Sequence, residues 1–174
     1  MGATPTIDGI FQDGEWADAN TIVLDSTKTI HLKHDKENLY IALDGDGGNI
    51  YVLKDDLITI LHASFSLGWA EYSKRNGTSW DCQREYNWEL YKLQEKTEAE
   101  ISGGMNRYLT NKGWVASLIP MGNPAQTEYA ISFEWLGLSS RIESVKKMKT
   151  PRILISSIQN IPPAERRGRD IVRR

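Results

Sequence analysis

The sequence is poor in cysteine and lacks any long apolar run. Cys82 is the only cysteine among the 174 residues, which excludes an intrachain disulfide and a zinc site built from several cysteines. Its neighbours Asp81, Gln83 and Arg84 supply no activating base, so we interpret Cys82 as an inert thiol. No apolar run approaches the roughly 18 residues of a membrane span, and we expect no membrane insertion.

An excess of charge of one sign is also missing. The formal net charge is −2 and 25% of the residues are charged, which gives no general attraction to nucleic acid or to a membrane surface. The length predicts one domain over residues 1–174, with a basic tail from about residue 160 that is more typical of a solvated end than of an anionic partner site. Residues 1–5 do not resemble a signal peptide, so we expect an extracytoplasmic (secreted or periplasmic) protein if a leader was removed and a cytoplasmic one otherwise.

Signatures of common enzymes are absent. The sequence holds no Gly-rich phosphate loop, no Gly-x-Ser-x-Gly, no His-Glu-x-x-His and no kinase motif set. Asp55 and Asp56 are adjacent, so on a strand they would point to opposite faces, which argues against a shared acid and base site. We therefore favour a binding domain over an enzyme, with a hydrolase as the alternative.

The three histidines do not indicate a metal or haem site. His31 and His34 are three residues apart and would lie on opposite faces of a strand, where they cannot chelate one ion together. His62 lies in an apolar run, which is more typical of a hydrogen-bonded core residue than of a ligand. Haem would need a pair such as His62 with Met105 or Met121, and the spacing gives no support for one.

Alternating apolar residues and frequent turn residues predict an all-β fold, an antiparallel β-sandwich with one or two short helices. Thr97 and Glu100 form a capping-box pattern that begins a helix, and Gly113 can end it. A second short helix is predicted from Ser140 to Pro151. Strands are predicted over residues 21–25, 29–34, 39–43, 50–54, 57–63, 114–119, 127–133 and 152–158.

The densest aromatic stretch runs from Ile58 to Trp88 and predicts a long hairpin. Asn76-Gly77 lies in its middle, and this pair is the strongest short-range hairpin signal because both residues tolerate positive φ. We expect Trp69 and Trp80 to face each other across the turn and to form an aromatic platform.

The sequence suggests further ligand-binding residues beside this platform. Trp114 is another candidate, and Arg84 or Glu71 would hold the hydroxyl groups of a ligand. The alternative is that the tryptophans fill the core of the sandwich, which we favour for Trp88 because it shares a strand face with Tyr86 and Leu90.

Three segments carry a resemblance to a known family. They are I-D-G-I-F-Q-D-G-E-W-A-D-A at residues 7–19, L-Y-I-A-L at residues 39–43 and E-Y-A-I-S-F-E-W-L-G at residues 128–137. Together they resemble the family 9 carbohydrate-binding modules and the wider DOMON-like β-sandwich group. The chain departs from that family at residues 132–134, where Ser-Phe-Glu stands in place of a Glu followed by Ile-Pro, and in the hairpin around residues 61–64.

The resemblance implies a β-sandwich that binds carbohydrate, in which sugar rings stack on flat aromatic faces. Related modules often bind structural calcium. Asp44, Asp46 and Asn49 gather oxygen atoms in one turn, so calcium is the candidate cofactor, although the EF-hand order is absent and a plain turn is the favoured interpretation.

We therefore expect a non-catalytic carbohydrate-binding domain. Its partners would be a carbohydrate or another small ligand, with no nucleic acid, and other domains of a longer protein. One alternative is a hydrolase or an accessory domain of a larger exported enzyme. The other is a structural or interaction domain.

Overall fold

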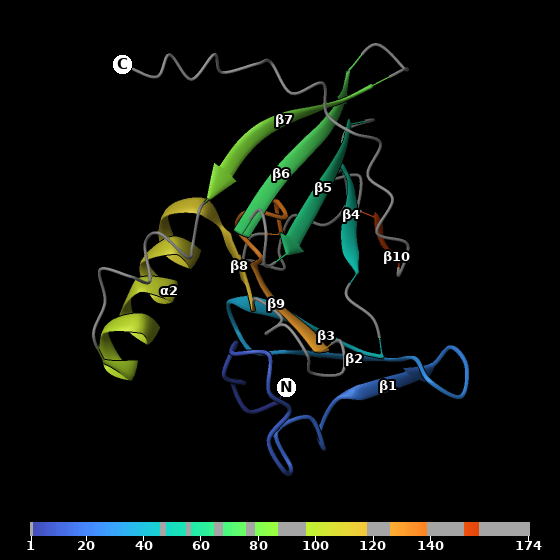
Figure 1. The fold of residues 1–174 in the computed structure, drawn as a ribbon, viewed down its shortest axis with the longest axis vertical. Coiled ribbons are helices and arrows are strands. Elements are labelled where there is room, and N and C mark those ends of the chain that lie inside the picture. The colour runs from blue at the N-terminus through green and yellow to red at the C-terminus, as the bar shows by residue number, and fades with distance from the viewer. Residues whose placement is uncertain are drawn as a thin grey trace, which may run out of the picture.

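The computed structural model describes residues 2–45, 48–54, 57–64, 68–75, 79–86, 97–117, 126–138 and 152–156. These ranges form ten strands and one helix (Figure 1). The elements are β1 (Asn20–Val23), β2 (Thr29–His34), β3 (Asn38–Asp44), β4 (Asn49–Lys54), β5 (Leu57–Ser64), β6 (Gly68–Arg75), β7 (Ser79–Tyr86), α2 (Glu98–Lys112), β8 (Trp114–Ala116), β9 (Gln126–Ser132) and β10 (Arg152–Ser156). The predicted helix from Ser140 lies outside the described residues.

The strands form two five-stranded sheets, and the predicted all-β class is confirmed. The first sheet has the order β1-β2-β3-β9-β8 and the second sheet has the order β10-β4-β5-β6-β7. Every neighbouring pair is antiparallel. Chain-consecutive strands mostly pair as hairpins, but β9 inserts between β3 and β8 and β10 pairs with β4. These two long-range pairings complete the sheets.

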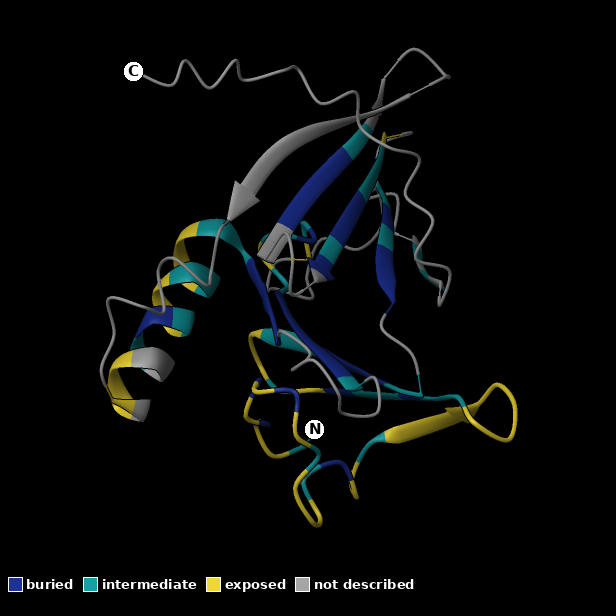
Figure 2. Cartoon of the chain, viewed as in Figure 1, coloured by how far each residue is buried: buried dark blue, intermediate teal, exposed yellow. Residues whose placement is uncertain are grey.

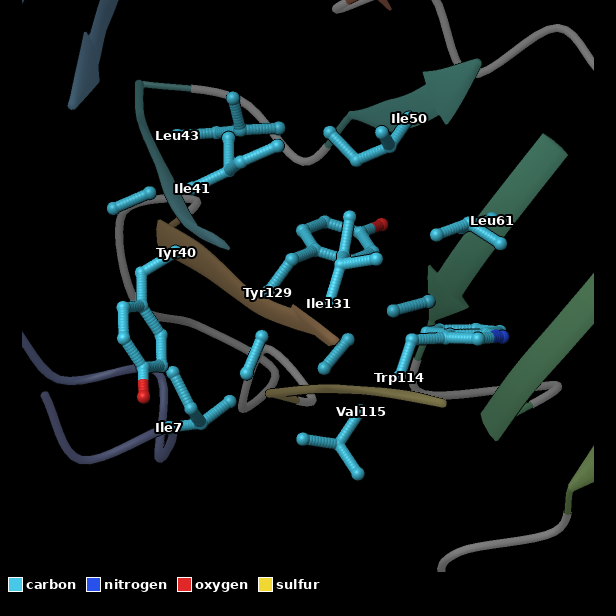
Figure 3. Close-up of a cluster of buried hydrophobic side chains, with 14 of the residues drawn as sticks. Ile7, Tyr40, Ile41, Leu43, Ile50, Leu61, Trp114, Val115, Tyr129 and Ile131 are labelled. Atoms are coloured by element: carbon cyan, nitrogen blue, oxygen red, sulfur yellow. The ribbon is translucent and has the colours of Figure 1, made fainter. Parts of the chain in front are cut away.

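The apolar core lies between the two sheets. Trp114, Tyr129 and Ile131 of the first sheet belong to one buried cluster with Ile50 and Leu61 of the second sheet (Figure 3). The Tyr129 hydroxyl donates a hydrogen bond of 2.7 Å to the backbone oxygen of Gly48, so the large ring is buried without losing its polar partner. Strand alternation explains this set, because residues two apart on a strand share a face.

The opposite face of the first sheet is covered as well. Residues 2–19, called the N-terminal segment below, run across it and bury Ile7 and Trp16 there, and Tyr40 belongs to the same buried cluster. Figure 2 shows the N-terminal segment as a mixture of buried and exposed residues. The first sheet is therefore buried on both faces along much of β3 and β9, where Tyr40, Ile41, Tyr129 and Ala130 are all buried.

Helix α2 begins and ends where the sequence predicts. The Thr97 side chain accepts a hydrogen bond of 3.2 Å from the Glu100 backbone N–H, as an N-cap residue does. Gly113 ends the helix at φ 85°, and its N–H donates to the Leu109 backbone oxygen. The helix packs against β8 and β9 at the edge of the first sheet. The described residues hold no helix with the length and apolarity that a membrane crossing needs.

Candidate functional site

Glu128 fixes the N-terminal segment to the first sheet. Its side chain is fully buried on β9. One carboxylate oxygen accepts hydrogen bonds from the backbone N–H groups of Asp8 (3.0 Å) and Gly9 (2.8 Å). The other oxygen accepts from the Trp16 indole N–H at 3.0 Å. The Asp-Gly turn supplies two donors because Gly9 adopts φ 84°, a left-handed conformation that glycine reaches without strain.

Burial sets the protonation of Glu128. Loss of water around the carboxyl group raises its pKa to about 7, although the donors at Gly9 and Trp16 act in the opposite direction. The negative charge of Glu15 adds to the increase. Near neutral pH this buried group therefore exists in both protonation states.

Lys33 holds the same segment from the neighbouring strand β2. Its side chain is buried, and its ammonium group donates to the Glu15 backbone oxygen and to an Asp18 carboxylate oxygen at 3.2 Å. The ammonium nitrogen also lies 5.0 Å from the centre of the Trp16 ring, which is a cation–π distance. Trp16 is thus held from two sides, by Lys33 and by Glu128.

A cleft of about 770 Å³ opens between the N-terminal segment and α2. Its apolar lining comes from the first sheet, the segment and the helix: Pro5, Ile7, Met105, Leu109, Val115 and Ala130. Its polar lining consists of hydroxyl, amide and carboxylate side chains: Thr4, Thr6, Asp8, Gln12, Asp35, Asn38, Tyr40 and Asn106. A second hollow of about 560 Å³, which Phe133 helps to line, shares Asn38 and Leu109 with it.

Asp35 organises the polar side of the cleft. One of its oxygens accepts the backbone N–H groups of Glu37 and Asn38, both at 2.8 Å. The other accepts the Tyr40 hydroxyl at 2.6 Å and the Thr4 hydroxyl at 3.2 Å. Burial alone would raise the pKa of Asp35, but these donors outweigh it and the pKa is lowered. Asp35 is therefore an ionised hydrogen-bond acceptor that links the N-terminal segment to the start of β3.

Burial and the neighbouring carboxylate raise the pKa of Tyr40 to about 12. The Tyr40 hydroxyl therefore stays protonated at neutral pH, donates to Asp35 and accepts from the Asn38 amide at 3.3 Å. This chain of fixed hydrogen bonds gives the cleft a defined polar side before any ligand arrives.

Two residues predicted from the sequence to bind a ligand meet each other instead. Trp114 on β8 is fully buried, stacks on Tyr129 at 6.3 Å between ring centres and donates its indole N–H to Glu71 at 3.2 Å. Glu71 on β6 is buried as well. Trp114 thus takes the core position that the sequence left open as an alternative. Its ring is buried on the inner face of the first sheet, where the indole N–H reaches Glu71 of β6.

The predicted strand pairing across Asn76-Gly77 is confirmed, because β6 and β7 pair antiparallel on either side of residues 76–78. The single hairpin predicted from Ile58 to Trp88 is wrong, because residues 58–64 belong to a third strand, β5, that pairs with β6. The predicted facing of Trp69 and Trp80 is wrong as well. Trp69 pairs with Tyr86, and Trp80 pairs with Lys74 next to the turn. The two tryptophans are therefore five pairs apart along the ladder, or about 17 Å at the usual rise of a strand. In a hairpin, residues pair when they lie at similar distances from the turn. Trp69 lies seven positions before Asn76 and Trp80 lies only four positions after it, so the two do not pair. The side chains of Trp69, Trp80 and Arg84 lie outside the described residues.

The predicted calcium ligands fall on both sheets. Asp44 ends β3 and accepts a hydrogen bond of 3.3 Å from Gln126, whereas Asn49 begins β4, is buried and hydrogen-bonds His62 at 2.7 Å. Asp46 lies outside the described residues. Across the described ranges, no group of three or more His, Cys, Asp or Glu side chains could hold a metal ion. Calcium binding stays a prediction.

The sequence did not point to the cleft, because its residues are ordinary one by one and come from distant stretches. The one available signal was the Asp35-Lys36-Glu37-Asn38 turn, whose first residue can accept the N–H groups two and three positions later. No family model, curated protein or solved structure that was compared with the chain matches it.

Proposed function

We propose that the chain is a non-catalytic carbohydrate-binding domain and that the cleft between the N-terminal segment and α2 holds the sugar. The observation that carries this proposal is the composition of the cleft. Its lining combines apolar residues, among them the buried Ile7, Val115 and Ala130, with hydroxyl, amide and carboxylate groups. A pyranose ring needs this combination, because its C–H face is apolar and its hydroxyls must find hydrogen-bond partners.

Prepositioned polar groups support binding of a neutral, hydroxyl-rich ligand. Asp35 and Tyr40 are already fixed by hydrogen bonds, so little conformational entropy is lost when a ligand binds. Asn38 at the start of β3 and Asn106 on α2 both line the cleft, and an amide can donate to one hydroxyl group and accept from another. Phe133 in the adjoining hollow offers an aromatic surface for a further sugar unit.

The hydrolase alternative has less support from this geometry. Asp8 and Asp35 are the two carboxylates that line the cleft. A glycoside hydrolase needs one carboxyl group that is protonated at its working pH. Asp35 has a lowered pKa and accepts four hydrogen bonds, so it is a poor proton donor.

The test is a calorimetric titration of soluble oligosaccharides against matched asparagine variants. Asn106 and Asn111 are both exposed on α2, but only Asn106 lines the cleft. We expect Asn106→Ala to raise the Kd about 5-fold, the effect of one lost hydrogen bond, and Asn111→Ala to leave it unchanged. Absence of binding by any glycan would contradict the proposed function.

The aromatic-platform hypothesis predicts a different result. If Trp69→Ala and Trp80→Ala abolish glycan binding while Asn106→Ala binds normally, the ligand site lies on the hairpin and not in the cleft.

A further inference from the structure

Strand β1 is an unprotected edge of the first sheet. All four of its residues, Asn20 to Val23, are exposed, and none is charged. The apolar side chains of Ile22 (47% exposed), Val23 (69%) and Leu24 (53%) are among the most exposed large hydrophobic groups in the described part of the chain. Figure 2 shows β1 as an exposed strand at the margin of the molecule.

The backbone of β1 offers a regular row of hydrogen-bonding groups on its free side. The Leu24 N–H donates to the Lys28 oxygen at 2.9 Å, which makes this a hydrogen-bonded pair of the β1–β2 ladder. Pair type alternates along an antiparallel ladder, so Ile22 also bonds toward β2 whereas Thr21 and Val23 direct their N–H and C=O groups outward. No strand lies beyond β1 within the described ranges.

Proteins usually protect such an edge with charge, proline or a covering element. The other edge of the first sheet is protected, because α2 packs on β8. Edge strand β7 of the second sheet carries Asp81, Arg84 and Glu85, and β10 begins with Arg152 directly after a proline. Strand β8 also lacks charge and proline but is covered by α2, so β1 is the one of these four edge strands with no charge, no proline and no covering helix.

We propose that β1 pairs antiparallel with β1 of a second copy of this chain, across a two-fold axis at Ile22. In this register Thr21 faces Val23 of the partner subunit, and the reverse, so both outward residues of both copies form hydrogen bonds. Ile22 faces Ile22 of the partner subunit in a pair without backbone hydrogen bonds, where side chains come closest. The first sheet of one copy and the first sheet of the other, with five strands each, then form one continuous ten-stranded sheet.

Strand β1 brings no charge repulsion to a pairing with its own copy, because none of its residues is charged. The pairing places uncharged residues opposite uncharged residues across the whole of β1. The two acidic residues nearest the strand, Asp18 and Asp25, face the uncharged Ser26 and Ala19 of the partner subunit. A four-residue edge buries less surface than a standard stable interface, so we expect a concentration-dependent dimer with a Kd of about 1 to 100 μM.

A charge substitution with a matched control tests the location. Ile22 (47% exposed) and Leu57 (48% exposed) are equally exposed, and Leu57 lies on the second sheet. Ile22→Lys places two like charges directly opposite each other across the axis, so sedimentation equilibrium should show the Kd rising at least about 10-fold. Leu57→Lys should leave it unchanged. A wild-type chain that stays monomeric up to about 1 mM, or a dimer that Ile22→Lys leaves intact, would overturn the proposal.

Cysteine crosslinking tests the register in a Cys82→Ser background. The self-paired position 22 brings the two Cα atoms to about 4.5 Å, within disulfide range, whereas position 23 meets its own copy only diagonally at about 7 to 8 Å. Ile22→Cys should form a covalent dimer much faster than Val23→Cys under mild oxidation. Equal rates for both variants would contradict the register, and no crosslink at position 22 would contradict the pairing.

Discussion

The buried Glu128 should make the domain less stable as the pH rises through neutrality. Burial raises the pKa of this carboxyl group from its ordinary 4.5 to about 7, so the folded state favours the protonated form. The corresponding stabilisation is fully present below about pH 4.5 and is lost as the pH rises past about 7. The difference between these two pKa values corresponds to about 3 kcal/mol in the free energy of unfolding. Such an amount is a large part of the total stability of a domain.

Urea unfolding between about pH 4 and pH 9, followed by tryptophan fluorescence at constant ionic strength, measures this effect. Glu128→Gln removes the titrating group and keeps its size. The difference in unfolding free energy between wild type and Glu128→Gln should change by about 3 kcal/mol across the range, with the wild type losing relative stability at high pH. Glu134→Gln is the matched control, because it makes the same substitution at an exposed position.

The opposite outcome would show that the hydrogen bonds decide the protonation of Glu128. Three N–H groups, from Asp8, Gly9 and Trp16, donate to this carboxylate, and such donors favour its ionised form. A difference curve that rises with pH would mean that they outweigh burial. A flat curve would mean that the two effects cancel, and either result would refute the reasoning from desolvation.

Three further substitutions test single contacts by urea unfolding. Gly113→Ala should destabilise the domain by about 1 to 3 kcal/mol, because φ is 85° and a new Cβ would lie 2.5 Å from Trp135 Cβ. Thr97→Ala should cost about 1 kcal/mol by removing the N-cap of α2, and circular dichroism should show a frayed helix. Trp114→Phe should lower the free energy of unfolding by about 1 to 3 kcal/mol, because it removes an indole N–H that donates to buried Glu71. An unchanged stability would mean that this hydrogen bond does not stabilise the fold.

The sequence predicted those parts of the fold that depend on neighbouring residues. Strands β2 and β5 begin at the predicted residues, and α2 lies between its predicted cap residues Thr97 and Gly113. Alternation and capping are local signals, so they can be recognised without the tertiary structure. The position of β9 between β3 and β8 was not predicted, because strand pairing across 80 or more residues has no local signal.

Glu128 shows why the candidate site was missed. Alternation along β9 puts Tyr129 and Ile131 on one face of the strand, and both are buried in the core. Glu128 then falls on the other face, which an antiparallel sheet often leaves to solvent. That face is buried here because the N-terminal segment crosses it. The sequence around a polar strand residue does not indicate that a segment more than 100 positions away covers it.

The position of the N-terminal segment determines the shape of the cleft. Residues 4–8 and Gln12 form one wall, yet the described part of the segment before β1 contributes no strand to either sheet. Its place therefore depends on the few side chains that hold it, chiefly Glu128 and Lys33. Neither Glu128 nor Lys33 is among the residues that line the cleft. Substitutions there should alter ligand affinity through the position of the wall, whereas substitutions at Asn106 act on the ligand directly.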